Sequence, residues 1–476
     1  MNSRAGRLLA VGGLAVLAAC SLAPQYSVPT VAAVDSYKEA GDWLPATPAD
    51  TEPRGSWWGA FGDSTLDDLQ GRLQAGSQDL KAAVARVTQA RALARGANSN
   101  LFPTLDANGA ATRERTSANA PSSGGVSVTR TDYVASLDLS WEIDLFGRLR
   151  NGAAAARDRA DAAAADLAAV ELALRTELAS NYFSLRGADA TLQLLEDSVR
   201  IYDRALALTR NRHDGGIAGA VDVDQAQAQL SSTRAQLAAI RLQRAQFEHA
   251  IAVLLGLPPS GFSLEPAPVV AEAPQLAIGL PSTLLQRRPD IASAEREVAA
   301  ANAEIGVARA AWFPVFSFGA SGGYESLSSA AWFDAPSRYW AAGPAVALPL
   351  LDVGGRSSVN RRARAAHEEA VAHYRQAALN AYREVEDNLA ALHHLADEYA
   401  AEDAAAAAAK SSAYHADERY AAGVADYIEV TSTQSTALRA QLAALDARVR
   451  RLNAAVALVR ALGGGWSAER TAQAAP

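Results

Sequence analysis

The stretch Arg212-His-Asp-Gly-Gly-Ile217 returns 207 positions later as Arg419-Tyr-Ala-Ala-Gly-Val424. In each copy an acidic residue follows at the same distance, Asp222 in the first and Glu429 in the second. A duplicated unit predicts a quasi-symmetric fold, in which an interpretation of one half must also hold in the other. The duplication therefore restricts the fold more than any single motif does.

Other features recur in the same order through residues 65–256 and 281–463. Asp144-Leu-Phe-Gly-Arg148 matches Asp352-Val-Gly-Gly-Arg356, and each copy ends in Leu-Gly. Further matched pairs are Leu101-Phe-Pro103 with Trp312-Phe-Pro314, and Gln227 with Gln434 at the start of a glutamine-rich helix. The two units therefore carry the same series of structural elements.

Two long segments without proline, 122–257 and 350–475, are expected to form helical hairpins. Within 148–213 apolar residues recur every seven positions, which predicts a helix that coils around its neighbours. These positions are Leu178, Leu185, Leu192, Val199 and Leu206, accompanied by Leu174, Ala188, Leu195 and Tyr202. The expected helices are 64–99, 148–213, 222–255, 282–310, 356–421 and 427–462, with Gly215, Gly216 and Gly423 at the reversals.

Between the short and the long helices the period of the apolar residues changes from 3.6 to 2. Thr131–Asp144 alternates apolar residues such as Leu137 and Trp141 with polar ones such as Asp138, the pattern of a strand in a membrane barrel. The sequence predicts two β-hairpins, over 104–144 and 315–350. A water-soluble hairpin domain is the alternative, but strands of this length match the roughly 9–11 residues that span a bilayer.

Four strands per chain are too few to close a membrane barrel, because the smallest barrels have about eight and open edges are not tolerated in lipid. The chain is therefore expected to share a barrel with copies of itself. Two copies would supply eight strands, whose interior is filled by side chains, whereas three would supply twelve and leave a channel. We therefore expect a mostly helical chain with a transmembrane β-barrel contribution, assembled as a trimer.

The first twenty residues have the features of a targeting sequence. Arg4 and Arg7 precede the apolar stretch 8–19, and Leu17-Ala-Ala-Cys20 follows, which predicts a signal peptide over 1–19. Cys20 is the only cysteine and fits a bacterial lipoprotein site, with cleavage elsewhere as the alternative. The residue after the cysteine is Ser21 rather than aspartate, which favours transfer of the lipoprotein to the outer membrane over retention in the inner membrane. After Cys20 no apolar run reaches the roughly 18–20 residues of a membrane helix.

Composition and motifs exclude several classes of protein. The formal net charge of −8 argues against nucleic acid as a partner. The chain lacks a nucleophile–base–acid arrangement and a glycine-rich phosphate loop, so we expect neither an enzyme nor a bound cofactor. The seven histidines show no metal-ligand spacing in the sequence, and adjacent His393 and His394 should point to different faces of a helix.

Several motifs together resemble the TolC-like outer-membrane efflux proteins, and more narrowly the NodT-like lipoprotein branch that serves RND efflux pumps. The main one is Leu285-Gln-Arg-Arg-Pro-Asp-Ile-Ala-Ser-Ala-Glu295, continued by Ala301-Asn-Ala-Glu-Ile-Gly306 and Phe313-Pro314. Others are Ala23-Pro-Gln-Tyr26, Trp57-Trp58, Phe61-Gly-Asp63 and Asp144-Leu-Phe-Gly-Arg148. The resemblance covers nearly the whole chain after Cys20.

The resemblance implies a homotrimer in the outer membrane, with a twelve-stranded barrel and a helical barrel in the periplasm. It would be a passive conduit for substrates from an inner-membrane RND-type pump and a periplasmic adaptor. Two alternatives stay open: the outer-membrane component of type I secretion, and a lipid-anchored periplasmic coiled-coil protein without a pore. The latter leaves the four alternating strands unexplained. The cargo does not follow from the sequence.

The resemblance also places the periplasmic entrance at the two hairpin ends, 212–227 and 419–434. The candidate gate and adaptor-contact residues are Arg212, Gly216, Asp222, Asp224, Arg419, Tyr420, Gly423, Asp426 and Glu429. Arg419 and Tyr420 would donate hydrogen bonds to a neighbouring protomer, and the acids would form a ring that attracts cations. Helix capping is the alternative for Asp222 and Asp426. Ser432 stands where many relatives carry aspartate.

The expected division of the chain follows the duplication. It consists of a signal peptide over 1–19, a lipid-anchored N-terminal segment over 20–63, a first repeat over 64–257, a proline-rich linker over 258–280, a second repeat over 281–464 and a C-terminal tail over 465–476. Each repeat contains a short helix, a β-hairpin and a long helical hairpin, the latter over 148–255 and 356–462.

Overall fold

The computed structural model describes residues 21–31, 36–39, 54–119, 124–268, 271–274 and 288–464. The predicted signal peptide, Cys20 and the predicted C-terminal tail lie outside these residues, as does part of the proline-rich linker. Among the described residues, no helix is both long and apolar enough to cross a membrane.

The chain divides into two compact units that do not follow the two repeats. The first unit combines Met1–Thr30, Arg86–Ala163 and Ser293–Arg375, and the second combines Val31–Ala85, Ala164–Ala292 and Gln376–Pro476. Each unit therefore contains matching parts of both repeats, as expected when duplicated halves pack side by side rather than as separate domains.

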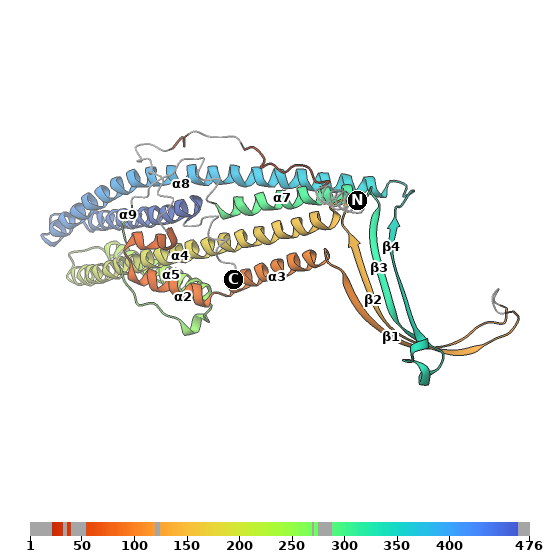
Figure 1. Ribbon diagram of the computed structural model, residues 1–476. Helices are drawn as coiled ribbons and strands as arrows, with labels where there is room; N and C mark the ends of the chain where they lie inside the picture. The colour runs from red at the N-terminus through yellow and green to blue at the C-terminus, as the bar shows by residue number, and fades with distance from the viewer. Residues whose placement is uncertain are drawn as a thin grey trace. The chain divides into compact units, whose positions relative to one another are not determined.

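A single antiparallel sheet in the first unit has the order β1-β2-β3-β4 (Figure 1). Its strands are β1 (Thr104–Arg115), β2 (Thr129–Ile143), β3 (Val315–Ser326) and β4 (Arg338–Ala347). The two predicted hairpins are thus paired as expected, and β2 joins them by pairing with β3. The strand predicted to run to Leu350 ends before Pro349, which has no N–H to donate to a ladder.

The register of the sheet brings the apolar residues of all four strands onto one face. Residues opposite each other in a ladder share a face. One row across the sheet is Leu105, Leu139, Ala320 and Ala342, and the next is Ala107, Leu137, Gly322 and Trp340. Leu105, Leu137 and Trp340 are exposed in the single chain. The other face carries Asp106 and Asp138, so the predicted alternation holds across the sheet.

The long helices form two hairpins, α4 with α5 and α8 with α9. Their bounds are α4 (Arg148–Asp214), α5 (Ala220–Leu254), α8 (Gly355–Ala421) and α9 (Tyr427–Ala461). The shorter helices are α2 (Ser64–Gly76), α3 (Gln78–Ser99) and α7 (Pro289–Ala310), with 3-10 turns η1 (Arg54–Phe61), η2 (Pro259–Gly261), η3 (Ser329–Ala331) and η4 (Ala335–Ser337). Of the expected helix 282–310, residues 282–287 lie outside the described part.

The expected single helix 64–99 is wrong, because the chain breaks at Ser77 into α2 and α3. The cause is long-range. Gly76 packs so closely on the end of the first hairpin that an added Cβ would lie 2.1 Å from the carbonyl oxygen of Leu255. Only glycine fits there, and the helix axis changes at this contact.

The heptad positions of α4 supply the core of the second unit. Leu178, Leu185, Leu195 and Leu206 are buried, and the last two join one apolar cluster with residues of α5, α8 and α9. In the first unit Ala155 packs against Ala300 and Ala303, so α4 and α7 approach closely. Alanine at these positions leaves little side-chain volume between the helix axes.

Candidate functional site

The two hairpin ends have the same backbone. Gly216 and Gly423 adopt φ of 73° and 76°, a conformation that favours glycine. In each turn the following N–H closes on an arginine carbonyl, from Ile217 to Arg212 at 2.8 Å and from Val424 to Arg419 at 3.0 Å. Gly215 also lies in the turn, as expected, but its φ is not positive, so Gly216 is the glycine of this turn whose backbone conformation favours glycine.

Arg212 ties the first hairpin end to the second. Its guanidinium donates to the carbonyl oxygens of Tyr420 at 3.0 Å and Ala421 at 3.2 Å, and lies 4.3 Å from the centre of the Tyr420 ring. The Tyr420 side chain is buried, with its hydroxyl 3.4 Å from Thr209 Oγ1. The Tyr420 carbonyl also accepts from the N–H of Gly423 at 3.0 Å, so Arg212 adds a second bond there and a bond to the Ala421 carbonyl. These bonds link the two hairpins at their ends.

Arg419 behaves differently, although it is the matching residue of the second repeat. It donates to Glu429 Oε1 at 2.9 Å across its own turn, and both side chains are exposed. Arg419 and Tyr420 therefore both have partners within the chain. An ion pair at the surface contributes only about 0–1 kcal/mol to the free energy of unfolding.

The four predicted acids do not gather into one cluster within the chain. Asp222 accepts from the backbone N–H of Gly219 at 3.0 Å, which is the capping role. Asp426 is the N-cap residue of α9 but makes no side-chain cap bond, and it is exposed, as is Asp224. Glu429 pairs with Arg419. Asp426 and Asp224 are thus the acids that face solvent without a capping bond.

Sequence reasoning missed a buried polar cluster behind the turns. Asp417 accepts from Gln434 Nε2 at 2.8 Å, and Tyr202 donates to the Gln434 carbonyl at 3.4 Å. Burial raises the pKa of Asp417, opposed by the Gln434 hydrogen bond, and burial raises the pKa of Tyr427 to about 12. The repeated Gln227 and Gln434 were the available signal, since both occupy the same place in the duplication.

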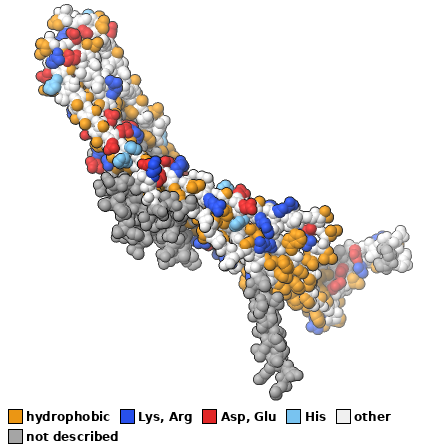
Figure 2. All heavy atoms as spheres, turned by 90° about the horizontal axis from the view of Figure 1, so that it is seen from above, with side chains coloured by type: hydrophobic (Ala, Val, Ile, Leu, Met, Phe, Trp, Pro, Cys, Tyr) orange, Lys and Arg blue, Asp and Glu red, His pale blue; other side chains and the backbone are white. Residues whose placement is uncertain are grey.

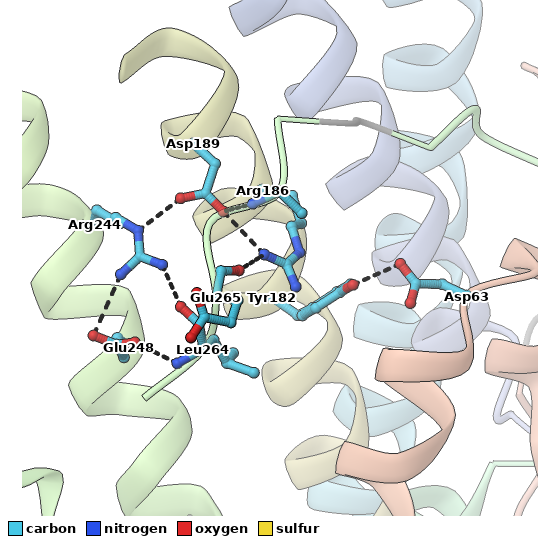
Figure 3. A network of polar contacts seen from close by, with 9 residues as sticks. Asp63, Tyr182, Arg186, Asp189, Arg244, Glu248, Leu264 and Glu265 are labelled. Carbon is cyan, nitrogen blue, oxygen red and sulfur yellow. Dashed lines mark hydrogen bonds and ion pairs between the residues drawn. The ribbon is translucent and has the colours of Figure 1, made fainter. Parts of the chain in front are cut away.

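A second network missed from the sequence lies further along the first hairpin (Figure 3). The Asp189 carboxylate is fully buried and accepts from Arg186 at 2.9 Å and from Arg244 at 2.6 Å. The two arginines also donate to the carbonyls of Glu265 and Leu264, at 2.8 and 2.6 Å. Asp189 therefore fastens α4, α5 and the segment after η2 to one another.

Among the described residues, one group has ligand atoms close enough for a metal ion, which the sequence spacing did not predict. His393, His394 and Asp397 on α8 bring these atoms within 4.8 Å of one another, and all three are exposed. The two imidazole rings lie edge to face at 5.2 Å. The side chains of adjacent helical residues leave the backbone in different directions, but here the two imidazole rings approach each other.

Comparisons with known proteins agree with this architecture. The family of outer membrane efflux proteins matches residues 69–257 and 280–464. The chain is 33% identical over 460 residues to the pyoverdine export outer membrane protein OpmQ of Pseudomonas aeruginosa, covering 96% of each chain. It is 31% identical over 456 residues to the cation efflux system protein CusC of Escherichia coli, covering 94% of this chain and 96% of that one.

A solved structure gives the same fold. The CmeC outer membrane channel of Campylobacter jejuni superposes with a TM-score of 0.87 at 25% identity, over 95% of this chain and 97% of that one. The duplicated helical hairpins, the four-stranded sheet and these matches along almost the whole chain lead to one conclusion. The chain belongs to the outer membrane efflux protein family, and it is an outer-membrane channel component of an efflux system.

Proposed function

We propose that the chain forms a homotrimeric conduit that carries substrates passively from an inner-membrane RND-type pump and a periplasmic adaptor to the outside. The observation that supports this most is the sheet. Among the residues that the structure describes, its edge strands β1 and β4 have no further strand partner, and its apolar face is exposed. Lipid does not tolerate such edges, so β4 of one copy would pair with β1 of the next, and three copies give twelve strands.

The N-terminal segment is proposed to be anchored through an acyl chain on Cys20. The residues that follow it are fastened to α7 in the first unit. Asn302 donates to the carbonyl of Pro24 at 2.9 Å, and Arg309 donates to that of Leu22 at 3.1 Å. Because α7 leads directly into β3, these contacts hold Leu22 and Pro24 near the helix end of the sheet, where the bilayer surface would lie.

The hairpin ends are proposed to be the gated periplasmic entrance and the surface that an adaptor contacts. Arg212 links the two hairpins of one chain through carbonyls of the α8–α9 turn. If the second hairpin moves away from the first during opening, these two bonds and the ring contact break together. Arg212 is therefore proposed as the latch, and Asp224, Asp426 and Glu429 as the acids that cations meet at the entrance.

The trimer is tested by negative-stain electron microscopy of protein extracted in detergent from outer membranes. We expect three-fold particles, and conductance after reconstitution into planar bilayers. Cys20→Ser should abolish acylation but leave trimers able to insert, because the strands hold the barrel in the membrane. Monomeric particles without conductance would exclude the conduit, and a periplasmic, monomeric Cys20→Ser protein would exclude the barrel as the main anchor.

A further inference from the structure

A basic cavity of about 510 Å³ lies at the junction of α7 and α8, beside the N-terminal segment. Its lining includes Leu22, Arg309, Trp312, Ser357, Arg361 and Arg364. All of these belong to the first unit, which also holds the sheet. Ser357, Arg361 and Arg364 are spaced to lie along one side of α8, so the helix presents a continuous wall to the cavity.

The three arginines of this cavity have no carboxylate partner among the residues that the structure describes. Arg309 donates to the Leu22 carbonyl at 3.1 Å, Arg364 to Asn360 Oδ1 at 2.9 Å, and Arg361 to Ser358 Oγ at 3.5 Å. All three of these partners are neutral. Nearby Arg356, by contrast, pairs with Asp352 at 2.9 Å. A chain of net charge −8 thus gathers uncompensated positive charge at one place.

Two features of the surroundings favour an anionic group carried by a lipid. The aromatic rings of Trp312 and Phe313 are exposed at the cavity and immediately precede Pro314 and β3. Aromatic side chains in this position are typical of the boundary between lipid and water. Figure 2 shows basic side chains beside a broad group of apolar ones on one face of the molecule.

We propose that this cavity binds the phosphate of an anionic phospholipid headgroup at the periplasmic surface of the outer membrane. Arg361 and Arg364 would hold the phosphate oxygens, since guanidinium groups match phosphate geometry in paired hydrogen bonds. Arg309 would contribute charge while it holds Leu22, and Trp312 would lie along the glycerol and the first acyl carbons. The proposal rests on the outer-membrane position and the N-terminal anchor proposed above.

The test is native mass spectrometry of the full lipidated protein with added phosphatidylglycerol or phosphatidylcholine of identical acyl chains. We expect retained phosphatidylglycerol to exceed phosphatidylcholine, and Arg361→Gln with Arg364→Gln to lower this preference roughly tenfold, the effect of losing a charge-assisted contact. Arg204→Gln with Arg439→Gln is the matched control. Both of these exposed arginines bond to carbonyls of their own helices, and the control should keep the preference.

Equal retention of the two lipids, or a preference that survives in the Arg361 and Arg364 variant, would overturn the proposal. Displacement of phosphatidylglycerol by millimolar inorganic phosphate would assign the cavity to a free anion and overturn the lipid assignment. The same spectra report the oligomer mass. A monomer that retains phosphatidylglycerol would refute the conduit but support the site, whereas a trimer without lipid preference would refute the site alone.

Discussion

The two hairpin ends share a backbone but use their matching side chains differently. In the first, Asp222 is occupied by the N–H of Gly219, and Arg212 reaches across to the other hairpin. In the second, Arg419 donates to Glu429 within the same turn, and among the described residues neither side chain bonds to the other hairpin. The difference lies in the acid of each turn. Asp222 is engaged by the backbone N–H of Gly219, whereas Glu429 is engaged by Arg419.

A second pair of matching positions, Arg210 and Asp417, also differs between the repeats, here in the sign of the side-chain charge. Arg210 donates to Gln227 Oε1 at 2.8 Å, and 207 positions on Asp417 accepts from Gln434 Nε2 at 2.8 Å. The amide of glutamine donates and accepts, so one position tolerates either sign of charge in its neighbour. The two repeats therefore share the geometry of the helix pair, while the charge at the hairpin ends is asymmetric.

Farther from the turns the hairpins differ in what holds them. Asp189 in the first hairpin is the buried acceptor for Arg186 and Arg244, whereas Ala396 occupies the matching position of the second. The first hairpin is thus fastened by a buried ion network to the segment that links the repeats. The second hairpin lacks that carboxylate and is held by a different buried arginine. Arg288 donates to Glu384 Oε2 of α8 at 2.7 Å and to the carbonyl of Ala461 in α9 at 3.0 Å.

The largest effect is expected from Asp189→Ala, which would leave two guanidinium groups without their shared carboxylate. Breaking a buried pair by removing one partner costs about 3–5 kcal/mol. Thermal unfolding of the detergent-solubilised protein, followed by circular dichroism, should show a clearly lower Tm. Asp197→Ala removes an exposed partner of Arg200 and should change Tm little. Equal shifts in the two variants would mean that the buried network does not distinguish the hairpins.

Next in size is the effect of Arg212→Ala on conductance. The variant loses both bonds to the α8–α9 turn, so the second hairpin should separate more easily and the mean conductance in planar bilayers should rise several-fold. Arg419→Ala, the matching change in the other repeat, removes only an exposed pair within one turn and should raise conductance much less. If the two variants conduct alike, the functional asymmetry between the hairpin ends does not exist.

A smaller effect is expected from Asp417→Asn, and it should depend on pH. Burial raises the pKa of Asp417 in the folded protein. Its contribution to stability is therefore fully present below its unfolded pKa of about 4 and is lost as pH rises through the folded value. Asparagine does not titrate, so the Tm of the variant relative to the wild type should increase from pH 4 toward neutrality.

The control for this prediction is Asp214→Asn, which changes an exposed acid at the other hairpin end. Its Tm difference from the wild type should stay nearly constant across the same pH series. If the Tm difference between Asp417→Asn and the wild type is also independent of pH, this carboxylate does not report the environment of the second hairpin.

The smallest effect is expected from the exposed acids. Asp426→Asn with Glu429→Gln should lower cation selectivity, measured as a shift of the reversal potential in a salt gradient. Asp222→Asn with Asp224→Asn should shift it less, because Asp222 is engaged with a backbone N–H. An unchanged reversal potential in the first variant would remove Asp426 and Glu429 from the entrance.

The sequence by itself determined the elements and their duplication. The heptads of 148–213, the alternation of 131–144 and the turn glycines Gly216 and Gly423 are local patterns, and local patterns set the backbone conformation. Pairing within each hairpin followed from the short connections. The buried positions of α4 followed as well, because a seven-residue period fixes which side faces the neighbours.

Only the tertiary structure decided which partner each charged side chain takes. Arg212 and Arg419 occupy the same position of the duplicated turn, yet one reaches a different hairpin and the other crosses its own turn. The break at Ser77 depends on the carbonyl of Leu255, and the burial of Asp189 depends on a segment some 78 positions away. Sequence periodicity specifies the face of a helix, whereas hydrogen-bond partners depend on distances of a few ångströms between elements far apart in the chain.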